Sequence, residues 1–252
     1  MIDLHTHLLP AVDGGARTIE ESIVVLERFA ADGVTAVACT PHLDASAAAT
    51  APVQAHAALR AELQARAPAG ITLIAGWEIQ LDLPNADLTD PALHLGGSSA
   101  ALVEWAGMTV PPNSTPEVYR LRMSGVVPVL AHPERYRGVT LDLVEEWRGA
   151  GAVTQVDSAM LFGRAPMCRF ARAMLQHGLV DCIASDNHAD ARSLASARRW
   201  LEELGAPEQA RLLTETNPAR LLAGQGVLPA EPVPDAEEGV LARLRALITG
   251  RP

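Results

Sequence analysis

Short apolar runs alternate with helix-like stretches from residue 1 to about residue 225, and this alternation constrains the fold more than any other feature of the sequence. Two parallel strands need a crossover between them, which a helix supplies, so such a chain forms a mainly parallel sheet flanked by helices. Seven runs predict the strands, at residues 2–7, 36–40, 71–79, 100–105, 126–132, 152–156 and 179–185. The predicted fold is therefore α/β, and one α/β barrel would use the 252 residues of the chain.

Six stretches between these runs have the spacing of amphipathic helices. The first opens with Thr18 and Glu21, which have the spacing of a capping box, and it places Ile23, Leu26 and Ala30 on one face. The other five helices are predicted at residues 52–67, 115–124, 141–150, 166–177 and 191–204.

A Pro-rich acidic segment at residues 229–235 predicts a stiff linker near the end of the chain. After it, five apolar residues with helical spacing predict a helix that docks back on the body, namely Val240, Leu241, Leu244, Leu247 and Ile248. We therefore expect a single domain at residues 1–228, followed by a linker and a helix at residues 229–252.

Charge and composition exclude several classes of protein. The net charge of −10 disfavours contact with a phosphate backbone, so we expect no nucleic-acid partner. The sequence has no window near the ~18 apolar residues of a membrane span and no signal-peptide pattern, so we expect no membrane insertion and a cytoplasmic location. All twenty basic residues are Arg, which excludes P-loop, Schiff-base and carboxylated-lysine chemistry. The three cysteines lack CxxC spacing and predict reduced, buried thiols.

Candidate metal ligands gather at the carboxyl ends of the predicted strands, where the active site of a parallel α/β barrel lies. His5 and His7 lie two residues apart on one strand and therefore project from the same face. Asp13 follows in the first loop, close enough to return to that face. The later strand ends carry six more candidates: His42, Glu78, Glu104, His132, Asp186 and His188.

Any one of these nine residues, taken alone, is more often a helix cap, a solvated loop residue or an incidental histidine than a metal ligand. The whole set is different, because imidazoles and carboxylates that converge at one barrel mouth are costly to bury unless cations neutralise them. Nitrogen and oxygen donors without sulfur suit divalent manganese, iron or zinc. The sequence therefore predicts a centre of two or three divalent ions.

The remaining histidines have plainer interpretations. His177 precedes Gly178, which predicts a helix C-terminus where a cation is favoured and where Gly suits the cap. His56 lies within a predicted helix and His94 within a polar loop, so we expect both at the surface.

Three arginines lie close to the candidate ligands in the sequence. Arg135 follows directly on the His132 segment, and we expect its guanidinium to bind an anion. Arg17 and Arg192 lie just past the first and last ligand groups, and for these two an anion clamp and a solvated residue remain equally open.

Missing motifs narrow the chemistry further. A cysteine-based phosphatase needs Arg six positions after its Cys, but those positions hold Ala45, Met174 and His188. The sequence has no Asp-x-Asp, which removes the aspartyl-phosphate phosphatases, and neither GxSxG nor GxGxxG occurs.

Several segments together resemble the PHP superfamily: residues 1–7 with 13–14 and 20–22, then 40–42, 76–79, 131–136 and 185–188. Within it the chain resembles the bacterial manganese-dependent protein tyrosine phosphatases that accompany capsule and exopolysaccharide tyrosine kinases. The resemblance runs to about residue 224. It implies a distorted seven-stranded (β/α) barrel of PHP type with up to three Mn²⁺ ions, or iron or zinc. It also implies hydrolysis of phosphotyrosine on the Tyr-rich tail of an autophosphorylating kinase.

The resemblance also carries roles onto particular residues. It implies metal ligands at His5, His7, Asp13, His42, Glu78, Glu104, His132, Asp186 and His188. It implies a phosphate contact for Arg135 and a bridging position for Glu104, and we expect His188 or Asp186 to protonate the leaving phenolate. Three positions depart from the family pattern: Gly14 stands where a second acid is usual, Arg17 where Lys is common and Asp157 where Asn is common.

Three other functions remain open on the sequence. A PHP phosphoesterase acting on a small substrate such as histidinol phosphate would use the same metal ligands. A TatD-like or amidohydrolase-type hydrolase also begins with His-x-His, although His42 and the Asp186/His188 pair exceed what such a site needs. A regulator that binds a kinase tail without catalysis would not need the full set of ligands.

Overall fold

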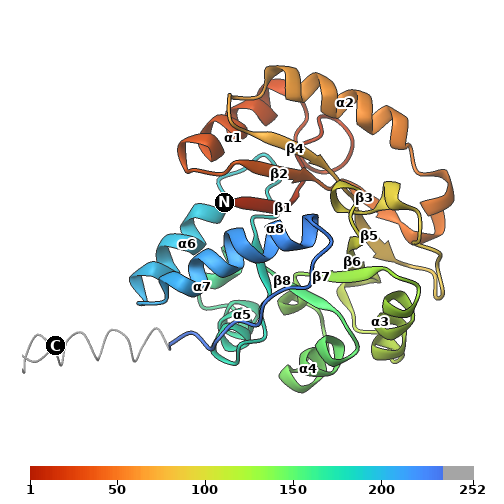
Figure 1. Cartoon of the computed structure of the whole chain (residues 1–252), viewed down its shortest axis with the longest axis vertical. Coiled ribbons are helices and arrows are strands. Elements are labelled where there is room, and N and C mark those ends of the chain that lie inside the picture. Colours follow the sequence, from red (N-terminus) through yellow and green to blue (C-terminus); the bar gives the residue numbers. More distant parts are fainter. Residues whose placement is uncertain (235–252) are drawn as a thin grey trace, which may run out of the picture.

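The computed structural model describes residues 1–234, and these form a single α/β unit with helices around a core of parallel strands (Figure 1). The strands are β1 (Ile2–Thr6), β2 (Ala36–Cys39), β3 (His42–Asp44), β4 (Thr72–Ala75), β5 (Glu78–Leu81), β6 (Ala100–Trp105), β7 (Val127–Ala131), β8 (Val153–Asp157) and β9 (Cys182–Ala184). They form one sheet in the order β1-β2-β4 and another in the order β3-β5-β6-β7-β8-β9. Every strand pair in residues 1–234 is parallel, which confirms the predicted α/β class.

The six predicted helices are present within a few residues of the predicted ends. They are α1 (Ile19–Ala31), α2 (Val53–Arg66), α3 (Ser114–Met123), α4 (Leu141–Gly149), α5 (Pro166–Gln176) and α6 (Leu194–Glu203). Thr18 caps α1 as predicted, because its side chain accepts a hydrogen bond from the backbone N–H of Glu21. The sequence analysis did not predict α7 (Pro207–Arg211), the π-helical turn Leu212–Thr216 or α8 (Asn217–Leu222).

The predicted strand at residues 71–79 is two strands, and β3 was not predicted at all. The break between β4 and β5 falls at Gly76, where a Cβ atom would lie 2.8 Å from Leu95 Cδ2 and 3.0 Å from Thr40 Cγ2. A side chain at this position would require Leu95 and Thr40 to shift, so glycine suits the break. A matching break at Thr40-Pro41 separates β2 from β3, so both strands change sheet at the same level of the fold.

Two apolar layers explain why these strands are buried on both faces. Along β6, Ala101, Val103 and Trp105 pack in the cluster between the strands and the outer helices. Ala100 and Leu102 point the other way, into an inner cluster. Leu221 of α8 belongs to that inner cluster, and Figure 1 shows α8 lying across the centre of the strands. The helix thus covers one end of the inner cluster, and the side chains at the carboxyl ends of the strands form the other.

The first and last strands lie side by side, which brings the two ends of the domain together. Thr6 forms a parallel bridge with Asn187, and the N–H of His7 donates to Asn187 O at 2.8 Å. The N–H of Asp186 donates to His5 O at 3.0 Å. These bonds place the His5–His7 segment directly against the Asp186–His188 segment.

The segment after α8 runs back over the body. Val233 is buried, and its N–H donates to Leu175 O of α5 at 3.0 Å, so this part of the predicted linker packs against the domain. The predicted helix with its apolar stripe at 240–248 lies outside the described residues. Among the described residues, no helix is both long and apolar enough to cross a membrane.

Candidate metal centre

The nine predicted ligands converge on one end of the strands, and Glu78 lies at their centre. Its Oε2 atom lies 3.2 Å from Nε2 of both His5 and His7 and 3.0 Å from Nδ1 of His42. Its Oε1 atom lies 2.7 Å from Nε2 of His132. One buried carboxylate therefore contacts four imidazoles that come from three separate parts of the chain.

Donor atoms of His5, His7 and Asp186 lie close enough together to share one ion. The Nε2 atoms of His5 and His7 lie 3.2 Å apart, and Asp186 Oδ1 lies 3.4 Å from the first and 3.3 Å from the second. Glu78 Oε2 lies 3.2 Å from both nitrogens, and these nitrogen–oxygen separations match those between ligands of one ion with bonds of about 2.0–2.1 Å. The arrangement fits a divalent cation held between them.

The remaining ligands form further groups around this one. Glu104 Oε1 lies 3.9 Å from His42 Nδ1, and its Oε2 lies 3.8 Å from His132 Nε2. The donor atoms of four groups lie close enough for each to share one ion: His5/His7/Asp186, His5/Glu78/His132, His42/Glu78/Glu104 and His7/His42/His188. Asp13 stands beside these groups and accepts from His7 Nδ1 at 2.7 Å. Within these groups Glu78, rather than Glu104, makes the closer contacts to the histidines.

The backbone is irregular where it aims these side chains. The register of β1 against β2 shifts between Asp3 and Thr6, the stretch that contains His5. His132 and Asp186 both have positive φ values, 37° and 48°. This region is unfavourable for residues with a Cβ atom, so the surrounding hydrogen bonds must hold both ligands there.

Charge and burial act in opposite directions on the ionisable groups. Burial lowers the pKa of His5, but the charges of Glu78 and Asp186 outweigh it and raise the pKa to about 9. Burial raises the pKa of Asp13, but the hydrogen bond and charge of His7 bring it down to about 2. The imidazoles and carboxylates of this cluster thus stabilise each other's charged forms.

Two of the three arginines considered in the sequence reach this centre. Arg135 donates to Asp186 Oδ2 at 2.7 Å and also pairs with Asp157. Arg192 donates to the same Oδ2 atom at 2.8 Å. Arg17 instead pairs with Glu21, and its side chain is 84% exposed. Arg192 therefore lies at the candidate site and Arg17 does not, whereas the sequence favoured neither as an anion-binding residue.

Residues behind the ligands were not predicted. Gln155 Oε1 accepts from Nδ1 of His5 at 2.9 Å, and Gln80 donates to Glu104 Oε1 at 3.3 Å. Glu134 is buried and accepts from the backbone N–H of Asp157 at 2.9 Å. A long polar side chain inside a fully buried strand, such as Gln155 in β8, is the signal that could have revealed the first of these.

Of the three other histidines, one lies as predicted and two are less exposed than predicted. His177 ends α5 as predicted, with Nδ1 2.8 Å from Ala173 O. His94 was expected at the surface, but it is 5% exposed because its ring nitrogens lie 2.7 Å from Ser98 O and 2.8 Å from Leu88 O. His56 is half-buried because its ring lies over Trp77, with the centroids 4.5 Å apart.

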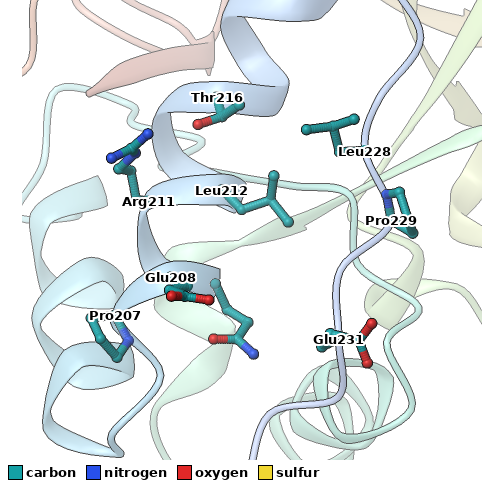
Figure 2. A pocket seen from close by; sticks show the side chains of 9 residues that line it. Pro207, Glu208, Arg211, Leu212, Thr216, Leu228, Pro229 and Glu231 are labelled. Atoms are coloured by element: carbon teal, nitrogen blue, oxygen red, sulfur yellow. The ribbon is translucent and has the colours of Figure 1, made fainter.

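A cavity of ≈530 Å³ lies elsewhere in the fold, between α7 with the π-helical turn and the segment 228–231 (Figure 2). Figure 2 shows Leu212 and Leu228 extending into it from opposite sides. The nine predicted ligands are not among the residues that line it. This cavity therefore lies apart from the candidate site, which is identified by its cluster of ionisable groups.

The sequence matches the family described as capsular polysaccharide synthesis, CpsB/CapC, over residues 1–223, and the chain belongs to this family. The tyrosine-protein phosphatase YwqE of Bacillus subtilis is 28% identical over 254 residues, covering 93% of this chain and 96% of that protein. The tyrosine-protein phosphatase CpsB of Streptococcus pneumoniae is 28% identical over 243 residues, covering 89% and 99%. The family resemblance found in the sequence is confirmed.

Solved structures agree with this assignment. A chain from the crystal structures of YwqE and CpsB, described as unique metal-dependent tyrosine phosphatases, matches with a TM-score of 0.76 and 26% identity. The match covers 93% of this chain and 99% of that one. Dihydropyrimidinase from Brevibacillus agri matches with a TM-score of 0.51 and 13% identity, which shows a shared fold alone.

Proposed function

We propose that this protein is a metal-dependent phosphatase that hydrolyses phosphotyrosine on proteins. The observation that carries the proposal is the cluster of His5, His7, Glu78 and Asp186: the two Nε2 atoms lie 3.2 Å apart, and each lies 3.2–3.4 Å from an oxygen of both carboxylates. Two guanidinium groups lie beside it. Metal sites with adjacent anion-binding groups are suited to phosphoryl transfer. The names of the relatives, tyrosine-protein phosphatases, support the substrate class.

The proposed ligands are the nine predicted residues: His5, His7, Asp13, His42, Glu78, Glu104, His132, Asp186 and His188. Their donors are imidazole nitrogens and carboxylate oxygens, which suit Mn²⁺ and also iron or zinc. Four overlapping groups of donors support two or three ions rather than one. We propose Mn²⁺ as the ion and a distorted seven-stranded barrel as the fold, in which β2 with β3 and β4 with β5 each count as one broken strand.

The residues around this shell have separable roles in the proposed reaction. Bound divalent ions supply the charge that polarises the phosphoryl group and activates water. Arg135 and Arg192 bind the phosphoryl oxygens, since their guanidinium groups lie together at Asp186 Oδ2. Both oxygens of Asp186 already have partners, Oδ1 with the histidines and Oδ2 with the arginines, so Asp186 is poorly placed to donate a proton to the leaving group.

The leaving group favours tyrosine over serine at such a site. A phenolate, with a pKa near ~10, leaves with less help from a proton donor than an alkoxide does. We therefore propose a phosphotyrosine protein as the substrate and an autophosphorylating tyrosine kinase of capsule or exopolysaccharide synthesis as the partner, in the cytoplasm. The name of the family, capsular polysaccharide synthesis, supports this setting.

The test is a metal count on the purified protein, combined with hydrolysis of p-nitrophenyl phosphate and of a phosphotyrosine peptide. We expect two or three divalent ions per chain, loss of turnover with a chelator and recovery with Mn²⁺. Turnover that continues in chelator, in protein free of metal, would contradict the proposal.

A further inference from the structure

A second cavity, of ≈340 Å³, opens beside the metal centre. One wall is the turn that follows β8, with Ser158 and Phe162, and the other is the start of α6, with Arg192 and Ser196. Both walls follow the carboxyl ends of strands, so the cavity lies on the same side of the fold as the ligands. A cavity of this size is within the range of small-ligand pockets.

Ser158 is a buried polar group that lacks a partner in this cavity wall. The residue is 1% exposed, and its Oγ atom forms no hydrogen bond within residues 1–234. The hydroxyl of Ser193, in the opposite wall, donates to Asp32 Oδ2 at 2.8 Å and is already satisfied. A buried hydroxyl without a partner is costly, so Ser158 is suited to bind an oxygen atom of a ligand in the cavity.

Phe162 offers a fixed aromatic surface to the same cavity. Its side chain is 39% exposed, although its ring packs edge-on against Trp200 with the centroids 6.2 Å apart. Arg172 holds the turn on both sides of Phe162, donating to Leu161 O and Gly163 O at 3.0 Å each. A large apolar ring that is held in place and left partly uncovered is suited to pack against another ring.

Arg192 joins this cavity to the metal centre. It lines the cavity, and its Nη1 atom lies 2.8 Å from Asp186 Oδ2. A single ester oxygen joins the phosphate of phosphotyrosine to its ring, so a phosphoryl group held by Arg192 places the ring within a few ångströms of that guanidinium. Ala159 and Ala191 leave room for it between the walls.

We propose that this cavity binds the phenyl ring of the phosphotyrosine substrate, with Phe162 packing against the ring and Ser158 hydrogen-bonding to the ester oxygen. The proposal rests on the proposed phosphatase function and adds its specificity-determining residues. Selection of tyrosine over serine then has two sources, the leaving group and a surface that only an aromatic ester fills.

The experiment compares two non-hydrolysable ligands in the full-length, manganese-loaded protein. Phenylphosphonate and methylphosphonate share the phosphonate group and differ in the ring, so the ratio of their inhibition constants against p-nitrophenyl phosphate reports ring binding alone. We expect phenylphosphonate to bind about tenfold more tightly to the wild type. The ratio should fall to near one in Phe162→Ala and be largely kept in Phe162→Tyr.

Three controls keep the outcome decisive. Tyr119→Ala removes another exposed aromatic side chain, on α3, and should leave the ratio unchanged. Phe162→Leu keeps apolar volume without a ring and serves if Phe162→Ala fails to fold. Ser158→Ala should raise KM for p-nitrophenyl phosphate a few-fold and leave phosphonate binding nearly unchanged, because a phosphonate lacks the ester oxygen.

A ratio near one in the wild type, or an unchanged ratio in both Phe162→Ala and Phe162→Leu, would overturn the ring site while leaving the phosphatase function intact. Failure of the metal-loaded wild type to hydrolyse any phosphate ester would instead overturn the proposed function, and the ring site with it.

Discussion

The guanidinium of Arg135 lies 2.7 Å from Oδ2 of Asp186, while Oδ1 of the same carboxylate faces His5 and His7. One carboxylate thus separates the proposed metal shell from the proposed phosphate clamp. Metal binding and phosphate binding thus both involve Asp186 but use different oxygen atoms of it. Substitutions should therefore be able to affect one without the other.

Arg135→Lys should lower kcat/KM by roughly 10²-fold, because an ammonium group cannot reproduce the paired donors of a guanidinium. Metal content should stay unchanged, since Arg135 faces the oxygen of Asp186 that points away from the histidines. Steady-state kinetics and elemental analysis of the same sample measure both. Arg17→Lys, at an exposed site, is the matched control. Loss of metal in Arg135→Lys would show that Arg135 is structural.

Glu78→Gln should remove most of the bound metal and abolish turnover, because Glu78 contacts four histidines and an amide cannot supply the lost charge. Glu104→Ala, His5→Ala and His132→Ala should also abolish turnover. Metal content by elemental analysis, beside activity on p-nitrophenyl phosphate, measures the effect. Full activity in the Glu104 variant would refute the proposed centre as drawn.

Gln155→Leu should weaken metal binding about 10–100-fold, because Gln155 Oε1 accepts from His5 Nδ1 and so directs Nε2 toward Glu78. Competition with a metal-binding dye gives the affinity. Gln54→Leu makes the same change at an exposed position and should have no effect. Equal affinities in the wild type and in Gln155→Leu would mean that packing alone orients His5.

Gly15→Ala should destabilise the protein by about 1–3 kcal/mol and lower its metal occupancy, because a Cβ atom at Gly15 would lie 2.0 Å from His7 O. Gly14→Ala is the matched control, since a Cβ atom there has no described atom within 4 Å. Thermal unfolding of both variants, with and without manganese, measures the difference. Similar melting temperatures for the two variants would contradict the close approach at Gly15.

The sequence was sufficient for much of the fold because apolar runs and helix caps report local structure directly. The sequence did not reveal the break between β4 and β5, because the contacts of Gly76 with Leu95 and Thr40 depend on the tertiary fold. The sequence analysis placed His94 at the surface. The two backbone carbonyls that bind its ring depend on the path of the loop, which the sequence does not show.

The sequence also located part of the candidate site, because some of its residues follow directly from local patterns. His5, His7 and Asp186 could be found because ligands follow strand ends in a parallel fold. Gln155 could not, because its role depends on which ring nitrogen of His5 faces it. The difference between Arg17 and Arg192 likewise appears only once the paths of the two loops are known.

Asp3→Asn should stabilise the metal-free protein at pH 8 and do so much less at pH 4. Burial raises the pKa of Asp3 from 3.8 to about 6, against hydrogen bonds from Ser185 and His5 that lower it. The folded state therefore holds a proton that the unfolded state releases, and stability falls as pH rises from about 4 to 6. The ionised group then costs up to about 3 kcal/mol.

Urea unfolding of the chelated wild type and variant at the two pH values measures this difference. Asp142→Asn, an exposed change in α4, is the control and should show the same small effect at both. An effect of Asp3→Asn that does not depend on pH would contradict a buried, protonated Asp3.

The central claim is a metal-dependent phosphatase specific for phosphotyrosine. Its most direct test is the manganese-loaded protein assayed at equal concentrations of a phosphotyrosine peptide, a phosphoserine peptide and histidinol phosphate. We predict the highest kcat/KM on the phosphotyrosine peptide, reversible loss of turnover with chelator and no turnover in His5→Ala. Preference for histidinol phosphate, or activity that survives complete removal of metal, would contradict the account.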